Sequence, residues 1–525
     1  MALTREAYRA LEDIVGPENI SEEPANLAGY AYVFMVQPYM QTPAEEYFMP
    51  EWPVAALLPG CTEEVQAIQR VCNKYGIKSH AFSTGWFPGS LAGSPDTIAL
   101  DMRRMNRIID IDEKNMIAVI EPYVAVGQLH VECIKKGLRP HVIGPGPTTS
   151  SLASHAACCG MGPSSINTSH SSRNILGVEW VLSTGELLKL GSLGQSGEWF
   201  SADGPGPGIR GIMRGYMGSF GALGTFTKIS IKLYPWPGPD KHESTGRSPC
   251  YDPIIPERMS SYICAWKSWD DMHEAQYMIT EAEMTYSGDR AVAAWHGAMM
   301  TESNQEFYEL WQKGILQKNA FAFGIILGGH SDGEIAYQEK CLKAILEKTG
   351  GWIDEDLEKV PHAAGSNYWW HLWGGEIIKG IFRGTGSFFC AATGDDTIDN
   401  ACFGSYLGDK LMKPYVDGGQ FLQEVHNVWG SNLYEQATIG SHHEPLYQYD
   451  PFDIESTKAA IKLGFDSVGA AITEGVGLGF FENAGEMAHT MTSPHAHGFH
   501  KYMKKIKRVF DPNTASDPHG YCEPE

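Results

Sequence analysis

Short apolar runs and longer periodic stretches alternate along the first half of the chain. Apolar runs bounded by Pro and Gly predict strands at 54–58, 98–100 and 117–121. Apolar positions three and four apart predict a helix that is capped by Thr62 and ends at Gly76, and a second helix over 126–136. Strands over 178–182 and 187–190 flank a hairpin turn at 183–186. Alternating apolar and polar residues predict a half-buried strand over 226–233.

Prolines at positions 235, 237 and 239 mark a change in the pattern of predicted strands and helices. Beyond them the pattern predicts strands at 261–266, 291–295 and 320–327, and helices at 268–286, 303–318 and 333–348. Such alternation predicts one sheet with helices on one face. Two terminal helices complete the pattern: one is capped by Thr4 and ends at Gly16, and the other covers 504–510 before Asp511-Pro-Asn. We therefore expect a domain boundary at the prolines.

One glycine-rich loop interrupts the first half at residues 83–93. Gly85, Gly89 and Gly93 are four residues apart, can take φ > 0, and leave backbone N–H groups accessible to an anion such as a diphosphate. The spacing differs from that of the dinucleotide fingerprint and of the P-loop. A plain surface turn remains the alternative. A helix that opens within 148–159 could direct further free N–H groups at the same ligand.

Several motifs in fixed order carry a resemblance. They are the Pro59-Gly-Cys-Thr segment, the glycine-rich loop, Leu100-Asp101, Val119-Ile-Glu121-Pro122, Gly160-Met-Gly162, Asn174-Ile-Leu-Gly-Val-Glu179, Ser183-Thr-Gly-Glu186 and Gly218-Ser-Phe-Gly221-Ala-Leu-Gly224. Together they resemble the flavin-binding domain of the vanillyl-alcohol oxidase and p-cresol methylhydroxylase family. The resemblance implies an α+β fold. In it, a two-subdomain FAD-binding domain over 1–237, to which 493–525 returns, is followed by a cap domain over 238–492 with a large antiparallel sheet covered by helices.

The resemblance also implies the residues that contact FAD. They are Ser83, Thr84, Gly85, Trp86, Phe87, Pro88, Gly89, Ser90, Pro122, Cys159, Gly160, Gly162, Gly221, Gly224, Phe226 and Asn513. Family members often attach the flavin covalently through a His or Tyr. The glycine-rich loop has no His here, and the corresponding cap segment shows Gln420, so we expect non-covalent FAD. The nearby His426 is the alternative anchor.

Four residues are candidates for catalysis. Counting back from Glu179 places His170 where the family has its proton acceptor, and a neutral imidazole suits that role. His442, His443 and Tyr449 would face the substrate from the cap. The alternatives are a polar loop His170 bonded to its neighbours and a structural His pair bonded to carbonyls. A metal site at the pair, or at His497 and His500 on one helix face, is the minority interpretation, so no metal is expected.

Two further features bear on the substrate. Phenol-oxidising family members hold the phenolate with a Tyr-Arg pair, but the corresponding place at 480–483 has no Arg. Three tryptophans at 369, 370 and 373 predict either an aromatic wall of the pocket or an interdomain core.

Composition limits the partners. The net charge of −23 argues against nucleic acid and anionic membrane surfaces. No apolar run is long enough to span a bilayer, and the first residues do not resemble a signal peptide. The 11 cysteines show neither CxxC nor iron–sulfur spacing, which is typical of free thiols in a cytoplasmic protein.

These observations predict an FAD-dependent oxidoreductase that takes a hydride from a small substrate, namely an aromatic or benzylic alcohol, an alkylphenol or a 2-hydroxy acid. The alternative is a catalytic or structural flavoprotein subunit of a larger electron-transfer complex. Partners would then be the small-molecule substrate and either a second copy of the chain or a protein electron acceptor.

Overall fold

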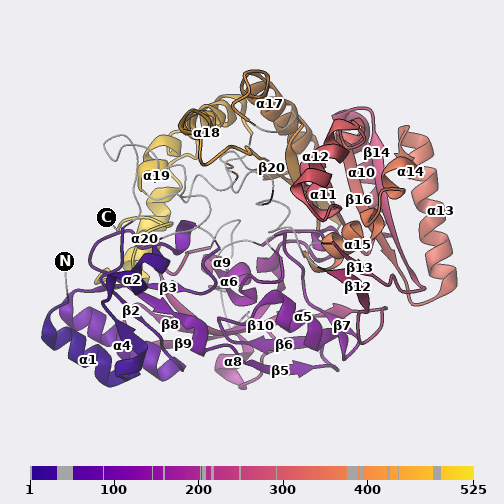
Figure 1. The fold of residues 1–525 in the computed structure, drawn as a ribbon. Helices are drawn as coiled ribbons and strands as arrows, with labels where there is room; N and C mark the ends of the chain where they lie inside the picture. Colours follow the sequence, from indigo (N-terminus) through magenta and orange to yellow (C-terminus); the bar gives the residue numbers. More distant parts are fainter. Residues whose placement is uncertain are drawn as a thin grey trace.

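The structure is a computed structural model that describes residues 3–31, 51–86, 88–144, 146–157, 160–201, 203, 209–213, 218–247, 250–290, 292–374, 383, 388, 390, 394–421, 426–435, 437–476 and 486–524. The N-terminal sheets form one half of the molecule and the cap elements the other, with the last helix returning to the first half (Figure 1). No helix in the described ranges is both long and apolar enough to cross a membrane.

The first sheet has the strand order β1 (Ile20–Ser21), β2 (Ala55–Leu57), β4 (Thr97–Asp101), β3 (Lys78–Phe82). β2, β4 and β3 run parallel because a helix connects β2 to β3, whereas β1 pairs antiparallel to β2. The helices α1 (Arg5–Val15) and α4 (Thr62–Tyr75) bury Leu11 and Ile68 in one core. The predicted strand at 54–58 and both helices are confirmed. Thr62 is not the cap, however, because the helix starts there and its hydroxyl donates to Glu179.

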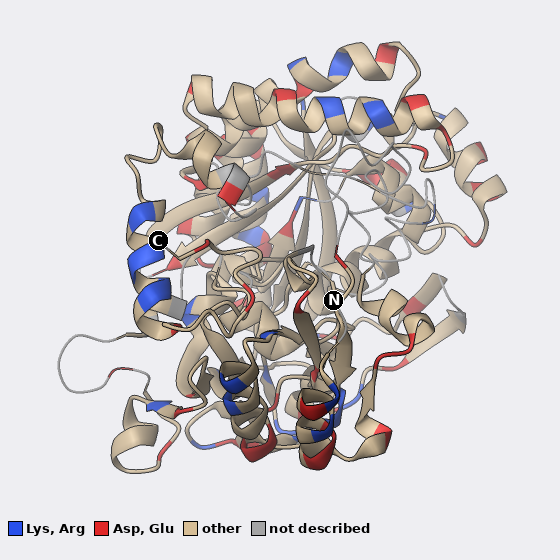
Figure 2. Cartoon of the chain, turned by 90° about the vertical axis from the view of Figure 1, so that its left-hand side faces the viewer, with Lys and Arg blue, Asp and Glu red and all other residues tan. Residues whose placement is uncertain are grey.

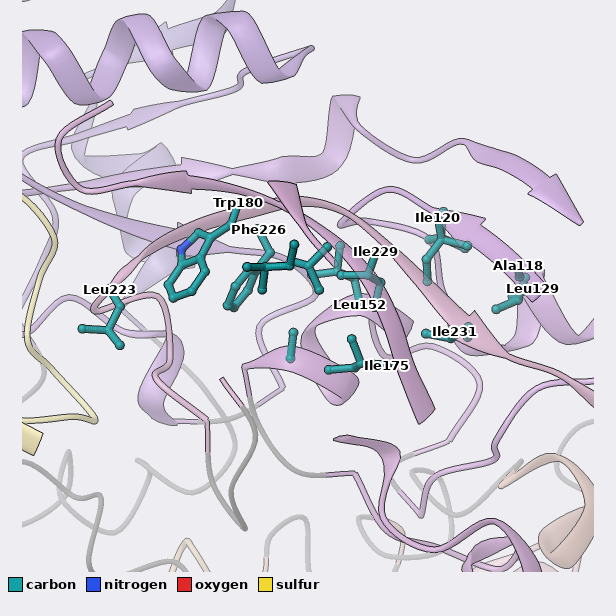
Figure 3. Packing of buried hydrophobic residues seen from close by; sticks show 14 of the residues in the cluster. Ala118, Ile120, Leu129, Leu152, Ile175, Trp180, Leu223, Phe226, Ile229 and Ile231 are labelled. Carbon is teal, nitrogen blue, oxygen red and sulfur yellow. The ribbon is translucent and has the colours of Figure 1, made fainter. Parts of the chain in front are cut away.

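The second sheet is antiparallel and has the order β5 (Ile108–Asp112), β6 (Ile117–Ile120), β10 (Gly224–Lys232), β8 (Ile175–Leu182), β9 (Leu187–Leu190). Its apolar face packs against α5 (Val126–Ile134) and α6 (Ser151–Ala156) (Figure 3). β10 is central rather than half-buried as predicted: Ser230 is fully buried and donates to the carbonyl of Trp199, which covers the far face. The strong apolar packing makes this sheet a rigid support for whatever binds above it.

The cap contains two antiparallel sheets. The first has the order β15 (Ser287–Asp289), β16 (Phe321–Gly328), β14 (Met259–Trp266), β17 (Trp352–Ile353), and the second the order β18 (Gly394–Asp396), β20 (Thr438–Pro445), β19 (Val428–Glu435). An isolated bridge between Arg290 and Gly430 joins them edge to edge. The guanidinium of Arg290 seals this joint by donating to the carbonyls of Val428, Ala322 and His426.

Helices cover the cap sheets, but the prediction of one sheet with helices on one face is wrong: there are two sheets, and helices pack against Phe323 and Ile325 on one face of β16 and against Ile326 on the other. α10 (Trp269–Glu281) and α13 (Asp332–Thr349) are capped by Ser268 and Ser331, and α12 (Asn304–Gln312) by Ser303. α17 (Ile398–Asp417) packs on the second cap sheet, and α18 (Ile454–Glu474) packs on α17. The predicted strand at 291–295 is wrong: residues there begin the helix α11 (Ala293–Met299), which packs on α15 (Ala363–Trp373). A short apolar run does not distinguish a strand from a buried helix.

The chain end returns to the first half through α19 (Glu486–Thr492) and α20 (His500–Phe510). Phe510 stacks on Trp180 with ring centroids 5.3 Å apart, and Met503 joins the same core. The buried ammonium of Lys507 donates to Asp511, Ala222 and Ser516, which fastens the helix to the segment before β10. The expectation that His497 and His500 share a helix face is wrong, because His497 precedes α20.

Candidate functional site

A cavity with about 910 Å³ of empty space, partly open to solvent, lies above the second sheet. Its walls come from the end of β3, the glycine-rich loop, α6 and the segment that leads into β10. The lining residues are His80, Ala81, Ser83, Thr84, Gly85, Trp86, Gly89, Ser90, Met102, Pro122, Ile143, Thr149, Ser150, Leu152, Ala153, Ser154, Ala157, Gly160, Phe220, Gly221, Gly224, Thr225 and Phe226.

Most of the residues expected to contact FAD surround this single cavity. Ser83, Thr84, Gly85, Trp86, Gly89, Ser90, Pro122, Gly160, Gly221, Gly224 and Phe226 all line it. Gly162 instead packs against the backbone of Gly144, and exposed Asn513 donates to Asn73, so neither lies in the lining. Phe87, Cys159 and the side chain of Pro88 lie outside the described part of the chain.

The three glycines of the loop serve different ends. Only Gly85 takes a left-handed conformation, with φ of +67°. A Cβ on Gly89 would lie 2.5 Å from the ring of Phe220, and a Cβ on Gly93 would lie 2.5 Å from Cβ of His519. The expectation that all three glycines open the loop to a ligand is therefore wrong for Gly93, which is required by close protein packing.

The side-chain carboxylate of Asp517, near the end of the chain, holds the end of this loop. Asp517 is fully buried, and it accepts hydrogen bonds from the Gly93 backbone at 2.8 Å and from the Thr97 hydroxyl at 2.5 Å. Burial opposes its charge, but these donated hydrogen bonds lower the pKa of Asp517 below its usual value. The Gly93 N–H is consequently not available to a diphosphate. Sequence reasoning did not identify Asp517, because the contact joins residues more than 400 positions apart.

His80 is a lining residue that the sequence reasoning also missed. It is almost fully buried at the end of β3, and burial lowers the pKa of its imidazole to about 4, so it is neutral. Its only signal in the sequence is its position three residues before the loop. α6 was expected to direct free N–H groups at the ligand, but the Ser151 N–H donates to the Val124 carbonyl and that of Ala153 to the Ser150 hydroxyl.

The lining fits an FAD molecule held by dipoles. Among the described lining residues there is neither Lys nor Arg, and seven carry a hydroxyl group, namely Ser83, Thr84, Ser90, Thr149, Ser150, Ser154 and Thr225. Hydroxyls and backbone N–H groups can hold a diphosphate, and Phe220 and Phe226 provide apolar surface for aromatic rings. When bound, FAD would supply the hydride acceptor.

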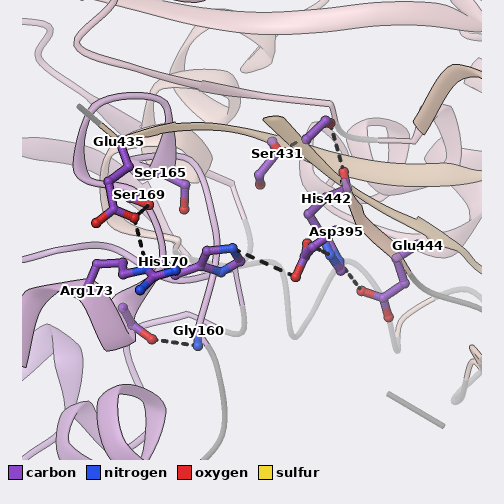
Figure 4. Close-up of polar contacts among 12 residues, drawn as sticks. Gly160, Ser165, Ser169, His170, Arg173, Asp395, Ser431, Glu435, His442 and Glu444 are labelled. Carbon is purple, nitrogen blue, oxygen red and sulfur yellow. Dashed lines mark hydrogen bonds and ion pairs between the residues drawn. The ribbon is translucent and has the colours of Figure 1, made fainter. Parts of the chain in front are cut away.

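One wall of the cavity connects to a polar network at the junction with the cap (Figure 4). The Ser171 hydroxyl contacts the Gly160 N–H at 2.6 Å, and the Ser171 N–H donates to the Gly160 carbonyl at 2.8 Å. The adjacent His170 points to the cap, where its Nε2 lies 3.9 Å from Oδ2 of Asp395. The other oxygen of Asp395 lies 2.8 Å from Nδ1 of His442, whose Nε2 lies 3.4 Å from Glu444.

The two histidines of this network are held in opposite states. Burial lowers the pKa of His170 and outweighs the nearby Asp395, so His170 is neutral. Burial also opposes the charge of His442, but Asp395 and Glu444 outweigh it and raise the pKa to about 9. Carboxylates only accept hydrogen bonds, so both ring nitrogens of His442 carry hydrogen. His442 is thus a buried cation and is not available as a base.

The other two catalytic candidates lie apart from the network. His443 follows His442 on β20, and successive side chains of a strand point to opposite faces. Its ring packs under α17 where Gly404 leaves room, and burial lowers its pKa to about 3. Tyr449 is fully buried in an apolar cluster with Met412 and Phe421. The structure therefore brings His170 and His442 together through Asp395 and separates His443 and Tyr449 from them.

The tryptophans of α15 belong to the interdomain core. Trp373 packs with Ile134 and Trp236 from the first half, while Trp370 donates to the buried carboxylate of Asp289. Asp289 also accepts from Trp429, whose ring lies against Gly144 next to the cavity wall. Trp429, absent from the sequence-derived candidates, is thus a tryptophan of the cap that lies close to the cavity wall. No cluster of His, Cys, Asp or Glu in the described ranges is arranged to hold a metal ion, and each described cysteine is a free thiol.

Comparison with known proteins agrees with the cavity chemistry. Residues 53–191 match the family described as FAD binding domain. An uncharacterized FAD-linked oxidoreductase of Mycobacterium tuberculosis is 26% identical over 193 residues, which are 35% of this chain and 39% of that protein. A probable mitochondrial D-lactate dehydrogenase of Danio rerio is 24% identical over 231 residues, 44% of this chain and 41% of its own. The matched region spans about two fifths of the length of these curated relatives.

Similarity of fold extends over the whole chain. The crystal structure of p-cresol methylhydroxylase with substrate bound superposes with a TM-score of 0.72 at 17% identity and covers 98% of both chains. This confirms the α+β fold class, with mixed helices and sheets in both halves. Residues 53–191, which match the FAD binding domain family, contain most of the residues that line the cavity, and FAD is the cofactor that this match indicates.

Proposed function

We propose that this protein is an FAD-dependent oxidoreductase that removes a hydride and a proton from a small organic hydroxyl compound. The observation that carries the proposal is the shared wall between the FAD cavity and the polar network. Ser171 binds the cavity residue Gly160, and the next residue, His170, begins the network that continues into the cap. An oxidoreductase of this type needs a proton acceptor beside its cofactor.

In this function His170 accepts the proton of the substrate hydroxyl. It is neutral at physiological pH because burial lowers its pKa. His442 keeps its proton and supplies a fixed positive charge between Asp395 and Glu444. Candidate substrates are aromatic or benzylic alcohols, alkylphenols and 2-hydroxy acids. The similarity of residues 53–191 to FAD-linked proteins, one a D-lactate dehydrogenase by name, supports an oxidoreductase without choosing among these substrates.

We further propose that FAD is bound without a covalent bond and that the FAD-binding domain comprises 1–237 and 493–525, with the cap over 238–492. Gly85 and Trp86, which line the cavity, stand at the loop position that supplies a His in some members of the family that the sequence resembles, and this supports non-covalent binding. Met503 and Phe510 pack in the core beneath the sheet of β5, β6, β10, β8 and β9, which supports assigning the chain end to the FAD-binding domain.

A second candidate is a flavoprotein subunit that passes electrons to a protein acceptor. One observation favours it: Lys501, Lys505 and Arg508 lie with Tyr502 and Val509 on the outer side of α20, and both of the latter are more than half exposed. Figure 2 shows this cationic helix near the C-terminus of a chain whose net charge is −23. Such a face suits an acidic protein. Fast reoxidation of the reduced flavin by O₂ alone would favour an oxidase instead.

Anaerobic stopped-flow reduction tests the main proposal. FAD-loaded protein is mixed with a panel of aromatic alcohols, phenols and 2-hydroxy acids, and flavin bleaching is followed. We expect one class to reduce the flavin and His170→Asn to slow that step by about 10²–10⁴-fold with FAD still bound. His330→Asn, an exposed position on the cap, is the matched control and should reduce like the parent. A His170→Asn variant that matches the control would remove His170 from the mechanism.

A further inference from the structure

The carboxylate of Asp395 stands between a neutral histidine of the FAD-binding half and a charged histidine of the cap. Its Oδ1 is engaged by His442 at 2.8 Å, while its buried Oδ2 has no hydrogen-bond partner among the described residues and faces Nε2 of His170 at 3.9 Å. A buried carboxylate oxygen without a donor is costly, so this arrangement needs an explanation.

We propose that Asp395 is a positioning residue that stabilises the imidazolium formed when His170 accepts the substrate proton. This inference rests on the proposed function and adds to it a residue from the cap. In the step, the O–H bond of the substrate breaks, its proton moves to Nε2 of His170, and its electron pair becomes the second bond of the product carbonyl. The C–H bond breaks with loss of a hydride, for which bound FAD would be the acceptor. His170 becomes positive, and Oδ2 of Asp395 then gains a charged partner within reach of a small side-chain rotation.

His442 makes this arrangement possible by holding Asp395 in place. It is fully buried, and its second nitrogen faces Glu444, so the ring has carboxylates on both sides. The three charged side chains sum to one negative charge before the proton arrives and to zero afterwards, when His170 is included. A buried site that becomes neutral on accepting the proton favours the transfer, since uncompensated charge is unfavourable away from water.

Other charged groups around His170 modify this effect. Glu435 on β19 favours the imidazolium. Arg173, on the 3-10 turn that follows His170 in the chain, opposes it, and so does His442. Arg173 and Glu435 form an ion pair with each other at 2.9 Å, which largely cancels their influence. His141, which is buried and donates to Gly160, lies on the other side and is neutral because burial lowers its pKa. Asp395 is thus the principal group that can support a positive His170.

The structure also explains why the residue is not interchangeable with its neighbour. Asp396 is the next residue of β18, so its side chain points to the opposite face. There its carboxylate accepts from the Thr397 N–H and from Asn400 at the start of α17. Asp396→Asn therefore removes one negative charge from the same strand without touching the network, which makes it a matched control.

Asp395→Asn tests the proposal through the pKa of His170. Hydrogen–deuterium exchange at the imidazole Cε1, followed by mass spectrometry across pH, gives this pKa in both the FAD-free and FAD-loaded protein. Loss of an opposite charge at this distance should lower the pKa of His170 by about 1–3 units, and Glu444 should keep His442 charged. In stopped flow, the limiting rate of flavin reduction should fall by up to about tenfold per unit, with substrate affinity and FAD content unchanged.

Two further variants keep the test informative if Asp395→Asn folds poorly. Asp395→Glu keeps the charge and should leave the pKa of His170 within about half a unit of the parent, while Glu444→Gln should lower the pKa of His442 and spare that of His170. A fall at His170 in Glu444→Gln larger than in Asp395→Glu would overturn the assignment, as would equal pKa values in Asp395→Asn and Asp396→Asn. If His170→Asn reduces the flavin at the parental rate, the proposed function fails, yet the exchange measurement still reports whether Asp395 supports His170.

Discussion

The buried carboxylate of Asp517 ties the C-terminal segment to the glycine-rich loop, so its removal should release FAD. Asp517→Ala deletes the acceptor of the Gly93 N–H, the Thr97 hydroxyl and the His519 N–H. Thr97 can turn to the Ser94 hydroxyl at 3.0 Å, so its loss is partly compensated. The Gly93 N–H has no such alternative among the described contacts. A hydrogen bond to a charged group contributes about 1.5–3 kcal/mol, so loss of the Gly93 bond and of part of the Thr97 bond gives about 3–4 kcal/mol for the loop.

This free energy should be expressed mainly as lost affinity for FAD. A chain of 525 residues with several cores is not expected to unfold in one cooperative step, so a global free energy of unfolding is a poor measure of one loop. If the loop must be restored before FAD binds, about 3–4 kcal/mol corresponds to a dissociation constant raised about 100- to 1,000-fold. Asp517→Asn keeps one acceptor oxygen and should raise it about tenfold.

Fluorescence titration of the FAD-free protein with FAD measures this constant. Asn513→Ala is the matched control in the same C-terminal segment, because its exposed side chain only contacts Asn73, and it should leave the constant unchanged. The expectation also separates Asn513 from the FAD-binding residues predicted by resemblance. If Asp517→Ala retains its circular dichroism spectrum and binds FAD within about twofold of the parent, the tail does not hold the loop.

Three further predictions address the cofactor and the charged network. A Cβ added at Gly89 would lie 2.5 Å from the ring of Phe220, so Gly89→Val should displace Phe220 from the cavity wall. The purified variant should lack flavin absorbance. Acid precipitation should leave the yellow colour in the supernatant, and colour in the pellet would point to a covalent anchor such as His426. The pKa of His442 is raised to about 9 from an unfolded value of about 6.5, so its ion pairs stabilise the fold fully below pH of about 6.5 and are lost as pH rises through 9. The difference between the parent and His442→Gln in the hydrogen–deuterium exchange protection of β20 should therefore shrink from pH 6 to pH 10, and an equal difference at both would contradict the charged state.

Local patterns were sufficient for most elements and for much of the cavity wall. The cap of the first helix, Thr4, falls where the sequence predicts it, and the helix predicted to begin at residue 268 is capped by Ser268, because an N-cap bond forms between residues three positions apart. The glycine-rich loop was recognised because its residue types are contiguous, and the resemblance then supplied Pro122, Gly160, Gly221 and Phe226, which line the same cavity.

Long-range contacts decided what each polar side chain can do. The sequence shows His442 beside His443 but does not show that the strand turns them to opposite faces, where Asp395 and Glu444 charge one and α17 buries the other. Nor does it show that Asp517 takes the N–H of Gly93 or that Asp395 faces His170. Residue type and spacing determine local conformation, whereas the protonation and availability of a buried group depend on which distant charges the fold brings within a few ångströms of it.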